Sequence, residues 1–268
     1  MNFKLALIQM RVEGGNKRAN LKHAQDLIAE AATNGAAMAL LPEAMDLGWT
    51  HPSSQTEAES IPDGSTCLQL SQWAAAYNLF LCTGITEADG NRIYNSAVII
   101  DSQGNVLCKH RKLNELEIAH PYYAQGDRLQ VVETQIGNLG LMICADGFAN
   151  DCVISRSLGY QGADIILSPC AWAVVHDHDN EATPYGDLWR SVYKPVAKEF
   201  GLWIVGASNV GPIDAGPWAG RKCIGCSLLI DPDGNEVLQG PYDRESILYA
   251  HIDLNARPTR GCGWADHS

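Results

Sequence analysis

Three residues at the ends of expected strands have side chains that could form a nucleophilic site. Cys144 follows an apolar run, 139–143, and precedes small residues that would expose its thiol and neighbouring backbone N–H groups. A free thiol has a pKa of about 8.5 and therefore needs a base near neutral pH. Glu43, directly after a proline, could accept the thiol proton, and the ammonium of Lys112 could stabilise a tetrahedral oxyanion.

Each of these residues, taken alone, has a simpler structural explanation. A cysteine at a strand end usually fills a core, and a single glutamate or lysine is usually a solvated surface residue. Their spacing along the chain does not bring them together. The chemistry therefore depends on the fold that positions them.

The apolar pattern predicts an α/β fold. Expected strands cover 3–10, 37–41, 79–85, 93–100, 106–112, 131–133, 139–143, 163–167, 202–207, 224–230 and 247–254. One helix is expected between a cap at Asn20 and a stop at Gly35, and others cover 65–76, 151–160 and 184–200. Pro195 is expected to kink or divide the last of these helices.

Three segments resemble the motif blocks of the nitrilase superfamily of carbon-nitrogen hydrolases, in the family's order. They are Leu41-Pro42-Glu43, His110-Arg111-Lys112-Leu113 and Gly140-Leu141-Met142-Ile143-Cys144-Ala145-Asp146. The segments 162–169, 205–211 and 227–234 extend the similarity almost end to end. The resemblance implies a four-layer α-β-β-α sandwich, which we expect to be a single domain over residues 1–268.

The resemblance also implies a role for each candidate residue. Glu43 would be the general base, Lys112 would support the oxyanion, and Cys144 would form a thioester or thioimidate. The backbone N–H of Ala145 would be the second oxyanion donor. No metal or cofactor is implied. Family members usually form homodimers or larger homo-oligomers, and the tail from Ala256 is a candidate for contact with a partner subunit.

Many family members carry a second glutamate between the lysine and the cysteine. Glu115 and Glu117 both follow Lys112, but neither stands at the expected distance from the Gly126-Asp127 pair. We expect Glu117 to take this role, with Glu115 as the alternative. Trp172 is expected to form an apolar wall of the substrate pocket.

The residues after the nucleophile indicate the substrate class. Ala145-Asp146 resembles the amidase branches rather than the Trp-Glu pair of true nitrilases, and 147–150 contains no arginine to bind a substrate carboxylate. Arg156 is expected to be structural. The expected reaction is hydrolysis of a non-peptide C–N bond in a small linear amide or carbamoyl compound, with release of ammonia or amine. The alternatives are an amide-forming acyltransferase and a catalytically silent binding protein.

Composition indicates which classes of binding partner and which cellular compartment to expect. The chain has 19 Lys and Arg against 31 Asp and Glu, a net charge of −12, which disfavours nucleic acid and anionic membranes. No signal peptide or membrane-spanning run is evident, so a cytoplasmic enzyme with reduced cysteines is expected. The Cys223 and Cys226 pair is interpreted as structural, and a metal at 176–179 is disfavoured.

Overall fold

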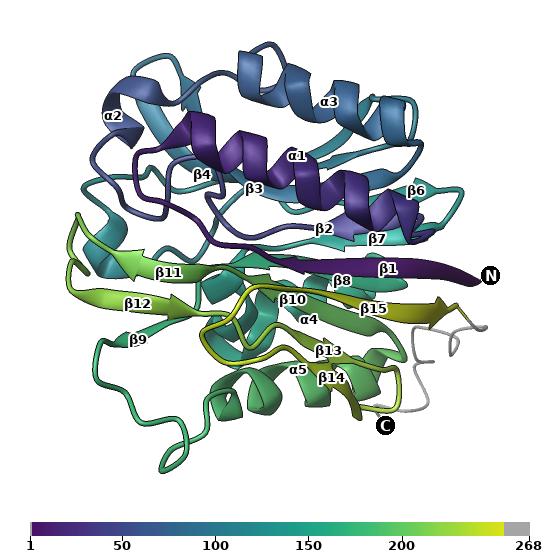
Figure 1. The fold of residues 1–268 in the computed structure, drawn as a ribbon. Coiled ribbons are helices and arrows are strands. Elements are labelled where there is room, and N and C mark those ends of the chain that lie inside the picture. Colours follow the sequence, from purple (N-terminus) through teal and green to yellow (C-terminus); the bar gives the residue numbers. More distant parts are fainter. Residues whose placement is uncertain (1, 255–268) are drawn as a thin grey trace.

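Two six-stranded sheets pack face to face between two layers of helices in the computed structural model, which describes residues 2–254 (Figure 1). The first sheet has the order β15 (Ser246–Asp253), β1 (Asn2–Gln9), β2 (Met38–Leu40), β3 (Phe80–Asp89), β4 (Arg92–Ile100) and β5 (Val106–Arg111). The second has the order β14 (Glu236–Gln239), β13 (Leu228–Ile230), β10 (Trp203–Ser208), β8 (Ile165–Cys170), β7 (Gly137–Leu141) and β6 (Val131–Thr134).

Both sheets have a parallel centre and antiparallel margins. β1, β2 and β3 pair in parallel in one sheet, and β10, β8 and β7 do so in the other. Beside them lies a small antiparallel sheet of β11 (Val210–Ile213), β12 (Arg221–Ile224) and β9 (Ala173–Val175). Because parallel strands begin at the same edge of a sheet, their carboxyl ends gather at the opposite edge, where loops can build a site.

The helices cover the outer faces of the two sheets. α1 (Lys17–Thr33) and α3 (Ser65–Tyr77) lie on the first sheet, while α4 (Val153–Tyr160) and α5 (Asp187–Phe200) lie on the second (Figure 1). The remaining helical segments are short: α2 (Ser54–Glu57), and the 3₁₀ turns η1 (Glu117–Ala119), η2 (Cys144–Phe148) and η3 (Asn150–Cys152). The predicted four-layer α-β-β-α sandwich is therefore confirmed.

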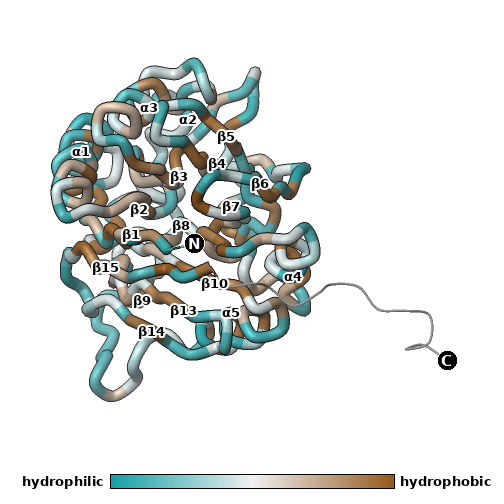
Figure 2. The backbone as a smooth tube through the Cα atoms, turned by 90° about the vertical axis from the view of Figure 1, so that its right-hand side faces the viewer, coloured by the Kyte–Doolittle hydropathy of each residue, from teal (hydrophilic) through white to brown (hydrophobic). Residues whose placement is uncertain are grey.

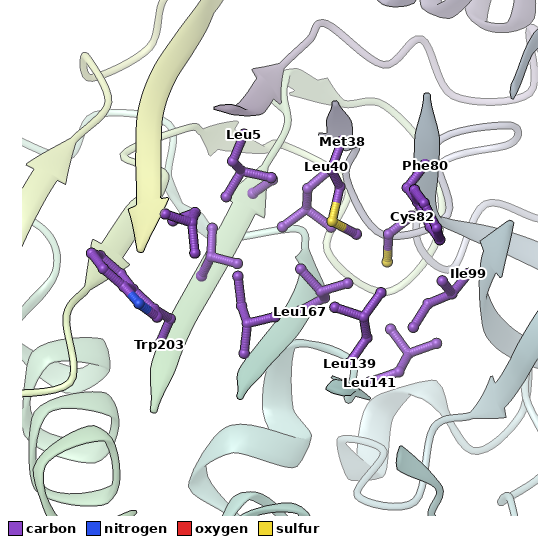
Figure 3. Packing of buried hydrophobic residues seen from close by; sticks show 14 of the residues in the cluster. Leu5, Met38, Leu40, Phe80, Cys82, Ile99, Leu139, Leu141, Leu167 and Trp203 are labelled. Carbon is purple, nitrogen blue, oxygen red and sulfur yellow. The ribbon is translucent and has the colours of Figure 1, made fainter. Parts of the chain in front are cut away.

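Alternation of side chains along each strand produces the layers. In β1, Leu5 and Leu7 point into the core between the sheets, whereas Ala6 and Ile8 pack under the helices. Figure 3 shows Leu5 facing the second sheet, where Leu139 and Leu167 lie. Apolar stretches accordingly follow the strands inside the molecule, and hydrophilic stretches form much of its periphery (Figure 2).

The prediction of Asn20 as the N-terminal cap of α1 was wrong. Asn16 is the cap, and its side-chain oxygen accepts a hydrogen bond from the Ala19 N–H. Asn20 is buried inside the helix, where its amide donates to the carbonyls of Glu13 and Asp46, both at 2.8 Å. Asn20 therefore fastens α1 to the loop that follows Glu43.

The structure differs from two further expectations about the elements. Of the kink or division expected at Pro195, the division does not occur, because the buried side chains Trp189, Tyr193 and Phe200 anchor α5 on both sides of the proline. A proline inside a helix costs about 3 kcal/mol, and burying each of several large apolar side chains contributes about 1.5–3 kcal/mol. The predicted strand 224–230 is split around Cys226, since β12 and β13 belong to different sheets. The tail from Ala256 lies outside the described residues.

Candidate active site

Cys144 lies at a sharp turn beyond the carboxyl end of β7. The strand pairs in parallel with β8 and ends at Leu141, and Cys144 opens η2 with a φ of 43°. A positive φ is uncommon for a residue other than glycine and costs on the order of 1–3 kcal/mol, so the surrounding structure must enforce it. The turn leaves Cys144 half-buried on the wall of a cavity.

Glu43 reaches the same cavity from the first sheet. Its backbone N–H donates to the carbonyl of Cys170, at the end of β8, over 3.2 Å, so the loop after β2 is bound directly to the second sheet. Gly84 lies against this loop. A Cβ atom added at Gly84 would stand 2.6 Å from the Cα of Glu43, so only glycine permits the approach.

Lys112 follows β5 and forms a buried ion pair with Glu43. Its Nζ lies 2.7 Å from Glu43 Oε1, and the Nδ2 of Asn95 donates to the same oxygen over 2.7 Å. The two charged side chains are only 2% and 1% exposed. The Lys112 backbone is held on both sides, since its N–H donates to Asn95 and its carbonyl accepts from Gly126.

The preference for Glu117 as the second carboxylate was wrong. Glu115 Oε2 lies 3.6 Å from Lys112 Nζ and its side chain is 2% exposed. Glu117 begins η1 at the surface and is exposed. The chain turns directly after β5, so the residue three positions after Lys112 returns to the ammonium, whereas Glu117 has already left the site. The lysine is thus held between Glu43 and Glu115.

Burial and mutual charge set the protonation states of the site. Burial alone would lower the pKa of the Lys112 ammonium, but the carboxylates of Glu115 and Glu43 raise it well above its usual value. Burial raises the pKa of Glu115 to about 7. Burial also raises the pKa of the Cys144 thiol, and Cys170 and Glu43 raise it further. At neutral pH Lys112 is therefore charged and the resting thiol is protonated.

Asp146 joins the loop of the nucleophile to the loop of the lysine. Its Oδ2 accepts from His110 Nε2 at 2.8 Å and from the Ile143 N–H at 2.9 Å. Its Oδ1 accepts from the N–H groups of Leu113 and Asn114 at 3.0 and 2.7 Å. Burial opposes ionisation, but the hydrogen bonds from His110 and the backbone outweigh it and lower the pKa of Asp146.

The connection through Asp146 was not predicted from the sequence. Both His110 and Asp146 belong to the motif blocks, but nothing in the chain indicates contact between residues 36 positions apart. Asn114 adds to the connection, because its Nδ2 donates to the carbonyl of Ala145 over 2.7 Å. Ala145 lines the cavity, so the peptide that follows the nucleophile is fixed from the lysine loop.

A cavity of about 290 Å³ opens above the three predicted catalytic residues. Trp172 lies on its wall, as predicted. The lining residues are Glu43, Trp49, Lys112, Leu116, Cys144, Ala145, Phe148, Ala171, Trp172, Ala173, Tyr185, Leu188, Trp189 and Trp218. The fold therefore places Glu43, Lys112 and Cys144 around one cavity that can hold a small molecule.

The other candidate residues lie outside this cavity. Arg156 forms ion pairs with Asp151 and Glu199 at 2.6 and 3.0 Å, in agreement with a structural role. Cys223 and Cys226 are buried free thiols. Between residues 2 and 254, no cluster of three or more His, Cys, Asp or Glu side chains suits a metal ion, and no helix has the length and apolarity to span a membrane.

Comparison with known proteins identifies the family of this chain. The family model described as carbon-nitrogen hydrolase matches residues 4–259. The omega-amidase NIT2 of Mus musculus is 30% identical over 263 residues, which cover 94% of this chain and 89% of that protein. A nitrilase of Pyrococcus abyssi is 29% identical over 255 residues, 94% of this chain and 90% of the relative.

Solved structures share the fold at lower sequence identity. The carbon-nitrogen hydrolase of Helicobacter pylori G27 superposes with a TM-score of 0.80 at 22% identity, over 95% of this chain and 90% of that one. An amidase of Nesterenkonia sp. AN1, in a variant with the acetamide moiety of fluoroacetamide bound to its active-site cysteine, gives 0.79 at 19% identity, over 93% and 90%. The predicted family resemblance is confirmed.

Replacing Asp146 should loosen both loops at once. In Asp146→Asn, one oxygen becomes an NH₂ group that faces two hydrogen-bond donors, so we expect the free energy of unfolding to fall by about 1–3 kcal/mol. Urea denaturation measures this loss. Since the pKa of Asp146 is lowered in the folded state, the difference from wild type should be full above the unfolded-state pKa of about 3.9 and shrink as the pH falls below it.

The matched control is Asp26→Asn. Asp26 forms an exposed ion pair with Lys22 on α1, so this substitution should change the free energy of unfolding by less than about 0.5 kcal/mol. Equal losses in the two variants would show that Asp146 does not hold the loops together.

Proposed function

The chain belongs to the carbon-nitrogen hydrolase family and is an enzyme that acts on C–N bonds; we propose that it hydrolyses a small linear amide or carbamoyl compound through a thioester on Cys144. The observation that carries this proposal is the buried contact of 2.7 Å between Glu43 and Lys112 on the wall that also holds Cys144. The relative named omega-amidase supports amide hydrolysis, and the fold neighbour named amidase carries the acetamide moiety of fluoroacetamide on its active-site cysteine.

Acylation begins with a neutral thiol, because the pKa of Cys144 is raised. As the sulfur attacks the substrate carbonyl carbon, Glu43 accepts the thiol proton, so a thiolate does not have to persist in the buried site. The S–C bond forms, and the π electrons of the carbonyl move to its oxygen. That oxyanion would accept hydrogen bonds from Lys112 Nζ and the N–H of Ala145.

Collapse of the tetrahedral intermediate completes the reaction. The C–N bond breaks as Glu43 returns its proton to the leaving nitrogen, which departs as ammonia or amine and leaves a thioester. Glu43 then accepts a proton from water, whose oxygen attacks the thioester. The S–C bond breaks as Glu43 returns this proton to the sulfur, so the acid leaves and the thiol and the Glu43 base are both restored. Because the pKa of Lys112 is raised, its ammonium keeps its charge throughout.

The reaction should be visible as both product and intermediate. With a panel of small amides, carbamoyl compounds and nitriles, we expect ammonia release together with an acyl adduct on Cys144 in intact-mass spectra. Cys144→Ala should abolish the adduct and turnover and leave the fold intact, because the change removes only a sulfur atom at a partly exposed position.

Cys152→Ala is the matched control, since Cys152 is also a half-buried free thiol but does not line the cavity. It should retain the adduct and full turnover. Substantial turnover by Cys144→Ala would remove Cys144 from the nucleophile role. An adduct that is discharged by an added amine but not by water would instead identify the acyltransferase reaction.

The ionisation of Glu115 should appear in the pH dependence of catalysis. Its pKa is raised to about 7, so in the wild type kcat/KM should rise with pH through this value as the carboxylate forms beside Lys112. Glu115→Gln should remove that step and lower kcat/KM by about tenfold or more. Steady-state kinetics from about pH 5 to about pH 9, roughly 2 pH units below and above this pKa of about 7, measure both effects.

Glu117→Gln is the control two positions away, and it should leave the pH profile unchanged because Glu117 is exposed.

The pH dependence of stability offers a second check on Glu115. The raised pKa means that the folded state holds the Glu115 proton more tightly than the unfolded chain, so the unfolding free energy should fall as the pH rises from about 4.3 towards 7, and this fall should be absent from Glu115→Gln. Identical profiles for the two variants would exclude Glu115 from the site.

A further inference from the structure

The cavity wall beyond the catalytic groups is almost wholly apolar. Glu43 and Lys112 are its only charged lining residues within the described chain, and six of the others are aromatic. These six are Trp49, Phe148, Trp172, Tyr185, Trp189 and Trp218. A wall of this kind makes large dispersion and hydrophobic contributions to binding and offers few hydrogen bonds, so it should favour substrates with an apolar body.

Four of these aromatic side chains form one connected surface. The rings of Trp172 and Trp189 stack with centroids 4.6 Å apart and planes 21° apart, and Phe148 packs 5.6 Å from Trp189. Trp189 Nε1 donates to the hydroxyl of Tyr185 over 2.9 Å. Gly206 lies against Trp172, since a Cβ there would come within 2.9 Å of its ring. The surface is thus fixed before any ligand binds.

Lys112, the only cation of the wall among residues 2–254, already has carboxyl groups beside it. Lys112 Nζ contacts Glu43 at 2.7 Å and Glu115 at 3.6 Å, so a substrate carboxylate would find no free counter-ion among the described lining residues and would meet two carboxyl groups. A buried charge without a partner costs several kcal/mol. A cationic substrate would gain little from the Trp49 ring, because the Lys112 ammonium already lies 5.9 Å from it.

We infer that the substrate amide carries an uncharged aromatic or bulky apolar acyl group, which packs against Trp172 and Trp189 while its carbonyl meets Cys144. This inference rests on the proposed function and specifies its substrate class. The volume agrees, since an apolar cavity of about 150 Å³ holds benzene and this cavity of about 290 Å³ leaves room for an amide group as well. Trp172 and Trp189 are then the residues that determine specificity.

Four primary amides test the inference by the kcat/KM for ammonia release. They are phenylacetamide, butyramide, the carboxylate-bearing succinamic acid and the cationic 4-aminobutyramide. We expect phenylacetamide to exceed butyramide by about tenfold or more, because its ring buries more apolar surface, and each charged amide to fall below butyramide. A charged amide that equals or exceeds phenylacetamide would overturn the inference.

A variant at the cavity rim tests the missing counter-ion directly. Leu188 lies on α5, lines the cavity and is 52% exposed, so Leu188→Arg should be tolerated by the fold. It should raise the ratio of kcat/KM for succinamic acid to that for phenylacetamide by about tenfold, whereas the neutral control Leu188→Gln should not. An unchanged ratio in Leu188→Arg would contradict the view that charge at the wall sets selectivity.

The assays distinguish loss of the substrate selectivity from loss of the hydrolase activity. Equal rates for all four amides, with an acyl adduct on Cys144, would reject the selectivity and retain the hydrolase. If none of the four amides or the wider panel gave ammonia or an adduct, the proposed function would fail, and this inference with it.

Discussion

The buried ion pair between Lys112 and Glu43 is the interaction on which the rest of the structure depends. An ammonium and a carboxylate that are 2% and 1% exposed remain charged only if other groups complete their hydrogen bonding. Asn95 donates to Glu43, and Glu115 supplies a second negative charge to Lys112. Loss of one partner from such a pair costs about 3–5 kcal/mol, so the sheet ends that carry these residues cannot shift independently.

A second buried carboxylate, Asp146, explains the unusual backbone around the nucleophile. The positive φ of Cys144 is unfavourable in isolation, but the turn is fixed by Asp146, which accepts four hydrogen bonds from residues on both loops. A single buried carboxylate therefore sets the position of Cys144 relative to Lys112. The catalytic groups are rigid because polar interactions tie them together at the rim of an apolar sandwich.

The aromatic cavity follows from what surrounds this polar cluster. The charged groups pair with one another, and tryptophan and tyrosine side chains fill much of the cavity wall. The chemistry of bond cleavage and the choice of substrate are thus served by different parts of one site. The polar cluster serves bond cleavage, and the aromatic wall selects the acyl group of the substrate amide.

The sequence by itself determined the family and the layered fold and predicted the three candidate residues Glu43, Lys112 and Cys144, which line one cavity, because strand periodicity and contiguous motif blocks are local properties of the chain. Local patterns in the sequence did not determine which other residues contact these three. The choice of Glu115 over Glu117 depends on the direction of a turn, and the role of Asp146 depends on a contact with His110 across 36 positions. Likewise, Pro195 stays within a continuous helix because burial against the second sheet outweighs its local penalty. Only the tertiary structure decides such cases, since it brings distant groups into the distances at which charge, hydrogen bonding and packing act.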